Sequence, residues 1–208
     1  MSVYLPSHFQ VTDRALLLEF MAKHAFVQLI GHGVDGFPFV SHLPLAVRDE
    51  GSCGVLEGHF ALGNPQVQDF ARKPQALVVF TGPHSYVSPT LYASSPAVPT
   101  WNYTAVHGSG AVTLIDDAEE KERLLKGLIA VHEPAYAETW RGLDEAYRQR
   151  MLKGIVGFRI VLEKLEGNFK LNQNRQPADR QRVYQAHGDG DENQRQLAAW
   201  MERLELVG

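Results

Sequence analysis

The spacing of apolar residues changes from helical to extended near the start of the chain. The sequence predicts a short helix over 13–23, capped by Thr12. Its apolar positions recur every three or four residues: Leu16, Leu17, Phe20 and Met21. Beyond this helix the pattern is that of strands with short connections, expected over 26–33, 37–47, 53–62, 76–82 and 105–115. Five strands at such intervals favour a small β-barrel.

Two helices are expected among and after these strands. The first covers 64–73, with Asn64 as its cap and Pro65 in its first turn. The second begins at Asp116, because an acidic residue three positions later matches a capping box, and it ends before the Glu-Pro pair at 133–134. The strand pattern is therefore interrupted by helices that the barrel must accommodate.

The C-terminal third mixes the two periodicities. In chain order we expect an amphipathic helix over 136–151 weakened at Gly142, a strand over 154–169, a polar and basic segment over 170–182, a flexible linker over 187–193 and a final helix around 197–204. The expected class is α+β and mainly β. We expect a barrel domain with inserted helices over 1–170 and a C-terminal polar segment and helix over 171–208.

Composition and charge narrow the classes of protein. A chain of 208 residues with 44% hydrophobic content can bury a substantial core. The net charge of −4 gives no general attraction to nucleic acid or anionic lipid. Cys53 is the single cysteine, so no internal disulfide forms, and no apolar run approaches the roughly 20 residues that span a bilayer. Without a signal-peptide pattern either, we expect a cytoplasmic protein with no membrane role.

Two short motifs imitate ligand-binding loops. Residues 31–36 match G-x-G-x-x-G, but the segment 37–47 that follows is a strand and not the helix that a pyrophosphate requires, so a hairpin turn is the better interpretation. The alternation of Asp and Asn from residue 189 resembles a calcium loop, yet Gln194 and Trp200 occupy the positions of its glycine and glutamate. We interpret that stretch as a solvated linker.

Candidate catalytic and metal-binding groups are sparse. Four histidines fall on or beside predicted strands: His42, His59, His84 and His107. They lack close paired spacing and a neighbouring cysteine or carboxylate, so we expect hydrogen-bonded core or pocket histidines and no metal or haem site. Gly108-Ser109-Gly110 lacks the G-x-S-x-G elbow of a nucleophilic serine. The sequence designates no catalytic residue.

Several blocks of sequence occur in a characteristic order. They are "YLPSHF", "SHLPL", "GHFALGNPQ", "GPHSYVSPTLY", "VPTWNY", "VGFRI" and "LEGNFKLNQNR", and they extend from Tyr4 to about Val183. In sequence and spacing the chain resembles the PaiB-like family of FMN-binding negative transcriptional regulators. The resemblance implies a split β-barrel like that of pyridoxamine-phosphate oxidases, FMN as cofactor and a homodimer.

The residues can be compared with what a flavin needs. A flavin requires a flat apolar slot, polar groups along the ring edge and cations at its phosphate. Slot walls are expected from Trp101, Tyr103, Tyr86 and Tyr92. Edge contacts are expected from Ser41, His42, His59, Thr100 and Asn102. The phosphate of the flavin is expected to contact Lys170, Gln173, Asn174 and Arg175, and the Arg175 guanidinium can donate two parallel hydrogen bonds to it. The alternative is that the aromatic residues only pack the core and that the polar run ends a strand in solvent.

Two positions depart from the family pattern. Leu62 and Gly63 stand where the family often has a cation, and Leu91 stands where a Trp is expected. A missing charge-assisted hydrogen bond costs about tenfold to a hundredfold in affinity. The protein can therefore have the fold and still be purified without FMN.

Three functions remain open from the sequence. The first is an FMN-binding regulator that senses a ligand or acts through a partner. The second is a flavin-dependent oxidoreductase or haem-handling enzyme, although we expect no oxidation of NAD(P)H. The third is a repressor that contacts DNA directly through the basic stretch 170–182, although no helix pair resembles a helix-turn-helix.

Overall fold

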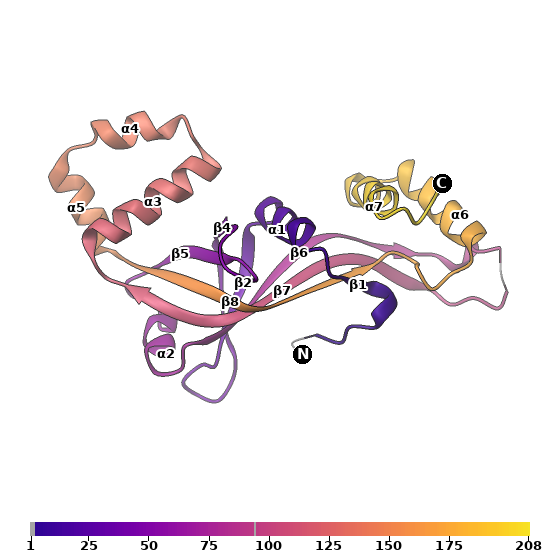
Figure 1. Cartoon of the computed structure of the whole chain (residues 1–208), viewed down its shortest axis with the longest axis horizontal. Coiled ribbons are helices and arrows are strands. Elements are labelled where there is room, and N and C mark those ends of the chain that lie inside the picture. Colours follow the sequence, from indigo (N-terminus) through magenta and orange to yellow (C-terminus); the bar gives the residue numbers. More distant parts are fainter. Residues whose placement is uncertain (1–2, 94) are drawn as a thin grey trace. The chain divides into compact units, whose positions relative to one another are not determined.

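The computed structural model describes residues 3–93 and 95–208, which form eight strands, seven α-helices and two short 3₁₀ helices (Figure 1). The strands are β1 (Gln10–Val11), β2 (Phe26–Gly31), β3 (Phe39–Pro44), β4 (Ala46–Arg48), β5 (Val55–Ala61), β6 (Gln75–Val87), β7 (Thr100–Ile115) and β8 (Ile155–Lys170). The helices are η1 (Ser7–Phe9), α1 (Arg14–Lys23), α2 (Gln66–Arg72), η2 (Pro89–Leu91), α3 (Ala118–His132), α4 (Tyr136–Gly142), α5 (Glu145–Lys153), α6 (Pro177–Gly188) and α7 (Glu192–Arg203).

The strands form one sheet in the order β3-β2-β6-β7-β8-β5-β4, and β1 pairs with β8. The pairs β2–β3, β2–β6, β4–β5 and β5–β8 are antiparallel. Only Leu45 separates the end of β3 from the start of β4. Because the two ends of the sheet are joined by this single buried residue, the sheet curls back on itself as a barrel does.

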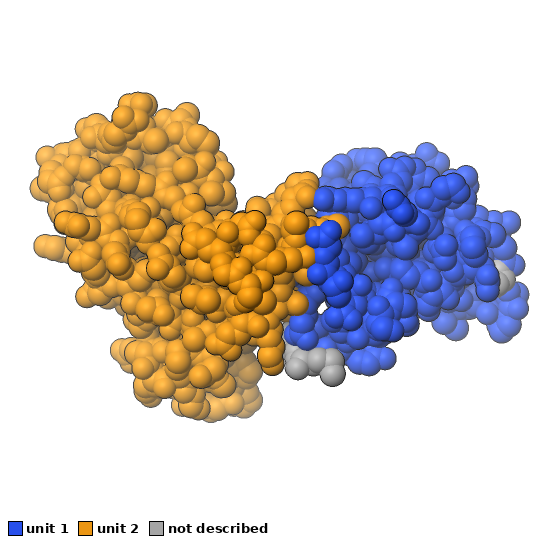
Figure 2. Space-filling model, in the orientation of Figure 1, with its two compact units in different colours: residues 1–13, 81–106, 166–208 blue, residues 14–80, 107–165 orange. Residues whose placement is uncertain are grey.

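The chain divides into two compact units, coloured in Figure 2. Unit 1 comprises residues 1–13, 81–106 and 166–208, and unit 2 comprises residues 14–80 and 107–165. The long strands β6, β7 and β8 contribute residues to both units. The boundary that the sequence suggests between residues 170 and 171 falls inside unit 1 and stays a prediction.

An aromatic cluster forms part of the core of unit 2. Phe60 on β5 stacks against Phe158 on β8 with 4.5 Å between ring centroids, and against Phe70 on α2 at 6.0 Å. Phe20 and Met21 of α1 are fully buried. A side chain at Gly58 would collide with Leu45 and Phe158, since its Cβ would lie 2.6 and 2.8 Å from their carbons. Glycine at this position is therefore required by the packing.

The core of unit 1 joins the end of β8 to the last two helices. Phe169 meets Trp200 of α7 edge to face at 4.9 Å, a favoured geometry for two aromatic rings. Val183 of α6 and Leu197 of α7 are fully buried where these helices pack together. The α7 helix begins with a complete capping box between Asp191 and Gln194.

Each of the six predicted strands is present in the predicted order along the chain, but their number and lengths differ, because β1 was not predicted. The segment 37–47 is divided into β3 and β4 at Leu45. The expected strand 76–82 continues to Val87, and the strand expected from residue 105 begins at Thr100. Both extensions keep alternating burial, so the apparent polarity of these segments comes from their exposed face. The G-x-G-x-x-G segment is the β2–β3 turn, as expected, with Gly33 and Gly36 at positive φ.

Two helix predictions need correction. The cap of α3 is Asp117, which accepts from the Glu120 amide, whereas Asp116 pairs with Lys121 at 3.1 Å. The helix expected over 136–151 is two helices, because Asp144 caps a new start after Gly142.

The expected linker 187–193 is mostly helical, since only residues 189–191 separate α6 from α7. The helix α6 itself was missed within a polar stretch, although Pro177 suits its first turn. Within residues 3–93 and 95–208, no helix combines the length and the apolar character needed to cross a membrane.

Candidate functional site

A hollow of about 570 Å³ opens in unit 2, between β3, β5 and the turn that leads into α2. Its lining includes three of the residues predicted to contact a ligand: Ser41, His42 and His59. Its size falls within the range of about 300–1,000 Å³ typical of small-molecule sites. We call it the Asn64 hollow, after the residue that closes one side of it.

Asn64 fixes the polar side of the hollow. Its Nδ2 donates to Ser41 Oγ at 2.9 Å, and its Oδ1 accepts from the Gln66 amide at 2.9 Å. The side chain of Gln66 in turn donates to the carbonyls of Leu29 and Phe39, both at 3.1 Å, which ties α2 to β2 and β3. The Ser41 hydroxyl is therefore held in place while its own proton is left to donate elsewhere.

Asn64 was predicted only as a helix cap. Its role in orienting Ser41 depends on β3 lying beside the turn, a long-range contact that local patterning does not reveal. The sequence did give one indication that Asn64 has a further role: the residue is a helix cap and also belongs to "GHFALGNPQ", one of the blocks that carry the family resemblance.

The two histidines of the hollow differ in their surroundings. His59 is half-buried, and its Nδ1 has no hydrogen-bond partner among the described residues. Burial lowers the pKa of His59 below its ordinary value, so the neutral ring is favoured. His42 is exposed on the edge strand β3, and its ring lies 6.5 Å from that of Phe26 in a roughly parallel orientation. Only His59 therefore presents a desolvated polar atom that lacks a partner.

The turn beside the hollow carries no cation, as the sequence indicated. Leu62 is exposed, and Gly63 lines the hollow. A Cβ added at Gly63 would have no heavy atom of the described residues within 4 Å, and the backbone there is not left-handed. The space for a longer side chain exists at this position.

The predicted aromatic walls lie in unit 1. Trp101 is about half exposed on β7, with the rings of His84 and Tyr86 on β6 at 5.8 and 6.2 Å. Tyr92 and Tyr103 instead lie inward, and their hydroxyls accept hydrogen bonds from Asn172 and Asn168. Of the four predicted walls, Trp101 and Tyr86 expose large ring surfaces, whereas Tyr92 is buried.

The predicted cations are engaged within unit 1. Lys170 Nζ donates to Thr100 Oγ1 at 2.6 Å and lies 5.8 Å from the ring centre of Phe9. The Arg175 guanidinium lies 4.3 Å above the ring of Tyr92, a cation–π contact. Arg180 donates to the carbonyls of Leu206 and Arg175. Three basic side chains of the 170–182 stretch therefore have partners in their own unit, while Arg182 is exposed.

The remaining predicted residues have three different environments. Gln173 serves the backbone, because its Oε1 accepts from the Leu171 amide at 2.7 Å and its Nε2 donates to the Phe169 carbonyl at 2.5 Å. Asn174 is exposed. Asn102 is fully buried, and neither atom of its amide has a hydrogen-bond partner in the part of the chain that the structure describes. The role of all three in binding a ligand stays a prediction.

The structure distributes the predicted site residues over the two units. Ser41, His42 and His59 meet in the Asn64 hollow. The others belong to unit 1: Thr100, Trp101, Asn102, Lys170, Gln173, Asn174 and Arg175. Among residues 3–93 and 95–208 there is no group of three His, Cys, Asp or Glu side chains that could hold a metal ion.

The chain is similar to proteins of known sequence and to proteins of known structure. Residues 3–164 match the family described as "Putative FMN-binding domain". The chain is 35% identical over 202 residues to the Protease synthase and sporulation protein PAI 2 of Bacillus subtilis, covering 96% of this chain and 97% of that protein.

Two solved structures show the same fold at low identity. The FAD and heme binding protein of Mycobacterium smegmatis is 16% identical, with a TM-score of 0.61 over 78% of this chain and 73% of that one. The flavocytochrome Anf3 of Azotobacter vinelandii is 14% identical, with a TM-score of 0.61 over 77% and 69%. The expected split-barrel class is confirmed, and the chain belongs to the PaiB-like family of FMN-binding-domain proteins, with FMN as the expected cofactor.

Proposed function

We propose that this protein binds FMN at the Asn64 hollow and acts as a negative transcriptional regulator, through ligand sensing or a partner protein. The observation that carries the proposal is the buried Nδ1 of half-buried His59, which has no hydrogen-bond partner among the described residues and belongs to a side chain that lines a hollow of ligand size. A buried polar atom without a hydrogen bond costs about 1–3 kcal/mol, which a bound polar ligand can recover. FMN supplies a planar redox-active ring system with acceptors and donors along one edge.

The residues of the hollow fit the edge of a flavin. The Ser41 hydroxyl has a proton left to donate, since its oxygen already accepts from Asn64. Neutral His59 offers a donor and an acceptor on its two ring nitrogens. Exposed His42 lies on the rim, where it can contact a ring or a ribityl hydroxyl. These three contacts recognise ring-edge chemistry and supply no full positive charge.

The missing cation limits the expected affinity. Gly63 and Leu62 offer no charge to a phosphate beside the hollow, so we expect weaker FMN binding than in relatives with a Lys or Arg there. Each such charge-assisted hydrogen bond is worth about tenfold to a hundredfold in affinity. Purification without bound flavin is compatible with this function.

The regulatory part of the proposal rests on the relatives. The name of the Bacillus subtilis protein refers to protease synthase and sporulation. A direct contact with DNA is less well supported, because Lys170, Arg175 and Arg180 all have partners inside unit 1. We therefore favour an indirect effect on transcription.

A cytoplasmic homodimer is the form we expect to act. Large apolar side chains are exposed near one another along the sequence in unit 1: Tyr86, Val98 and Trp101. Exposed aromatic residues of this kind are typical of protein interfaces. Light scattering after size exclusion tests this directly, and a monomer at micromolar concentration would contradict it.

Titration of FMN into the dialysed protein tests the cofactor. We expect saturable perturbation of the flavin absorption spectrum at tens of micromolar ligand. His59→Leu removes both ring nitrogens and their hydrogen bonds to the ligand, and we expect it to weaken FMN binding about tenfold. His132→Leu is the matched control on α3, where the histidine is exposed and outside the hollow. Equal affinity in the His59 and His132 variants would refute the proposed site.

A further inference from the structure

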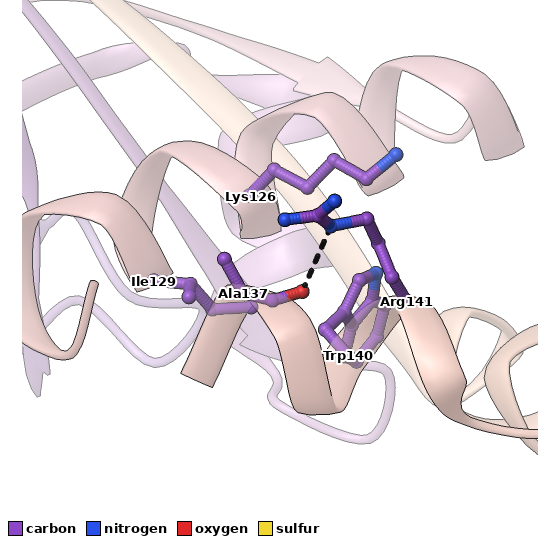
Figure 3. Close-up of a pocket in the computed structure, with 5 residues that line it drawn as sticks. All are labelled: Lys126, Ile129, Ala137, Trp140 and Arg141. Carbon is purple, nitrogen blue, oxygen red and sulfur yellow. Dashed lines mark hydrogen bonds between the residues drawn. The ribbon is translucent and has the colours of Figure 1, made fainter. Parts of the chain in front are cut away.

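A second pocket lies between α3 and α4 of unit 2 (Figure 3). Its volume is about 280 Å³, and none of the residues of the Asn64 hollow contributes to it. It is lined by Lys126 and Ile129 from α3 and by Ala137, Trp140 and Arg141 from α4. We call it the Trp140 pocket.

The floor of the Trp140 pocket is apolar. Trp140 is almost fully buried, while Ile129 and Ala137 remain partly exposed. The lining residues recur at three- and four-residue spacing on each helix, so each helix presents one face to the space between them. A ring or a branched aliphatic group can therefore contact the indole and the two aliphatic side chains together.

The polar part of the lining is cationic. Lys126 and Arg141 are both exposed, and in Figure 3 their side chains extend into the space between the two helices. Lys126 pairs with Glu122 at 3.0 Å and Arg141 with Glu138 at 2.5 Å, but neither carboxylate belongs to the lining. Exposed pairs between neighbours on a helix are worth well under 1 kcal/mol. Arg141 also donates from Nε to the Ala137 carbonyl at 3.4 Å, which leaves the rest of its guanidinium to a ligand anion (Figure 3). The amino group of Lys126 has further protons to donate to the same anion besides the one directed at Glu122.

Glu122 holds the floor of the pocket in place. Its carboxylate accepts from the Trp140 indole N–H at 3.4 Å and from Arg148 of α5 at 3.3 Å, in addition to Lys126. The hydrogen bond from Lys126 is the largest cause that lowers the pKa of Glu122, so the carboxylate stays ionised at neutral pH. Because three helices share one carboxylate, the indole orientation is set before any ligand arrives.

We propose that the Trp140 pocket binds a small amphipathic carboxylic acid, with its apolar group against Trp140 and its carboxylate between Lys126 and Arg141. The pocket is smaller than most sites for drug-sized ligands, which favours a ligand smaller than FMN. Two cations next to an apolar floor match an anion with an apolar body, whereas a neutral apolar molecule leaves both charges unused. This site lies beyond the proposed flavin function and does not depend on it.

Phenylacetate and its neutral analogue phenylacetamide provide a matched pair of probes. We expect phenylacetate to quench tryptophan fluorescence saturably and to bind about tenfold or more tightly than the amide, because the charge-assisted bonds are lost in the amide. The double substitution Lys126→Gln, Arg141→Gln should remove this preference for the acid. The matched double substitution Arg150→Gln, Lys153→Gln, on exposed positions of α5 outside the pocket, should leave it unchanged.

The origin of the signal can be assigned, because Trp101 and Trp200 are the two other tryptophans. Trp140→Phe should remove the phenylacetate-dependent quenching, and the lysine–arginine variant tests the site without altering the core. Equal affinity for acid and amide would overturn the proposal. The same holds for quenching that persists in Trp140→Phe, for no saturable quenching, and for displacement of phenylacetate by FMN, which would place the probe in the flavin site.

Discussion

The Asn64 hollow of unit 2 and the turn from Lys170 to Arg175 in unit 1 both contain residues that were predicted to contact a flavin. Those of the hollow were expected on strands, whereas those of the turn were expected in a polar and basic segment after a strand. Within residues 3–93 and 95–208, the hollow has a histidine nitrogen without a hydrogen-bond partner and a serine hydroxyl whose proton can donate. The turn instead uses Gln173 and Lys170 for hydrogen bonds within its own unit.

The difference separates two uses of polar residues. A polar group with its hydrogen bonds made inside the protein stabilises the fold, and its removal costs folding free energy. A polar group left without a partner costs folding free energy, and a ligand that forms a hydrogen bond to it can recover that cost. Substitutions should therefore affect stability at the turn and binding at the hollow.

The largest effect should come from Asn172→Ala in the turn. Asn172 is buried at φ 66°, where asparagine is better tolerated than alanine, and it donates to the Tyr92 hydroxyl at 2.7 Å. We expect a loss of about 2–4 kcal/mol in the free energy of unfolding. Urea denaturation measures it. The control is Asn174→Ala, two residues on and exposed, with an expected change below about 0.5 kcal/mol. Similar losses of unfolding free energy in the two variants would contradict a special structural role for Asn172 in the turn.

A gain of function should follow at the hollow. Gly63→Lys places a cation where an added side chain has room, and it should tighten FMN binding by about tenfold to a hundredfold. Gly142→Lys is the matched control, because that position is equally open and lies at the end of α4. Isothermal titration with FMN compares them. If both lysines changed the affinity for FMN equally, the effect would come from net charge, and the proposal that FMN binds at the hollow would be contradicted.

The pH dependence of stability compares a histidine from each unit. Burial lowers the pKa of both His187 and His59 below 6.5, so the unfolded chain binds protons that the folded chain resists. Stability is thus present above about pH 6.5 and is lost as the pH falls below it. His187 is 1% exposed and its ring nitrogens lack partners among the described residues, whereas His59 borders the hollow.

His187→Gln should therefore flatten the dependence of the urea midpoint between pH 7.5 and 5.5 more than His59→Gln does. The two variants are measured against the unmodified chain at both pH values. A larger effect from His59 would mean that the hollow excludes water better than its open shape indicates.

Of the substitutions in the two regions that remove a hydrogen bond, Ser41→Ala should have the smallest effect on stability. The variant removes the acceptor of the Asn64 side chain, but the hollow is open, so water can replace the lost bond. We expect less than about 1 kcal/mol in unfolding free energy together with a measurable loss of FMN affinity. A loss of unfolding free energy as large as that for Asn172→Ala would show that Ser41 mainly stabilises the fold. It would contradict the proposed difference between the hollow and the turn.

Local patterning was sufficient for most elements of the fold. The helices α1, α2 and α3 and the order of the main strands follow from spacing and capping residues, since these signals act over a few residues. The division of the 136–151 helix and the helix α6 were not predicted. In the first case Asp144 offers a competing cap, and in the second few apolar residues mark the helix, so tertiary packing decides.

The same limit applies to the candidate sites: local sequence patterns identify candidate residues, but long-range contacts decide which of them meet. The sequence supplied Ser41, His42 and His59 as candidates, and their meeting in one hollow depends on β3 and β5 lying near the turn at Asn64. The Trp140 pocket was not predicted, because the helical spacing of Trp140 looks the same whether its face is packed or open.

By itself, then, the sequence determined most of the elements, the family and the chemical types of residue available. Only the tertiary structure decided which polar groups are used up inside the protein, as at Gln173, and which are left for a ligand, as at His59. The physical reason is that hydrogen-bond satisfaction and burial depend on contacts between residues far apart in the chain, whereas spacing and capping are properties of neighbours.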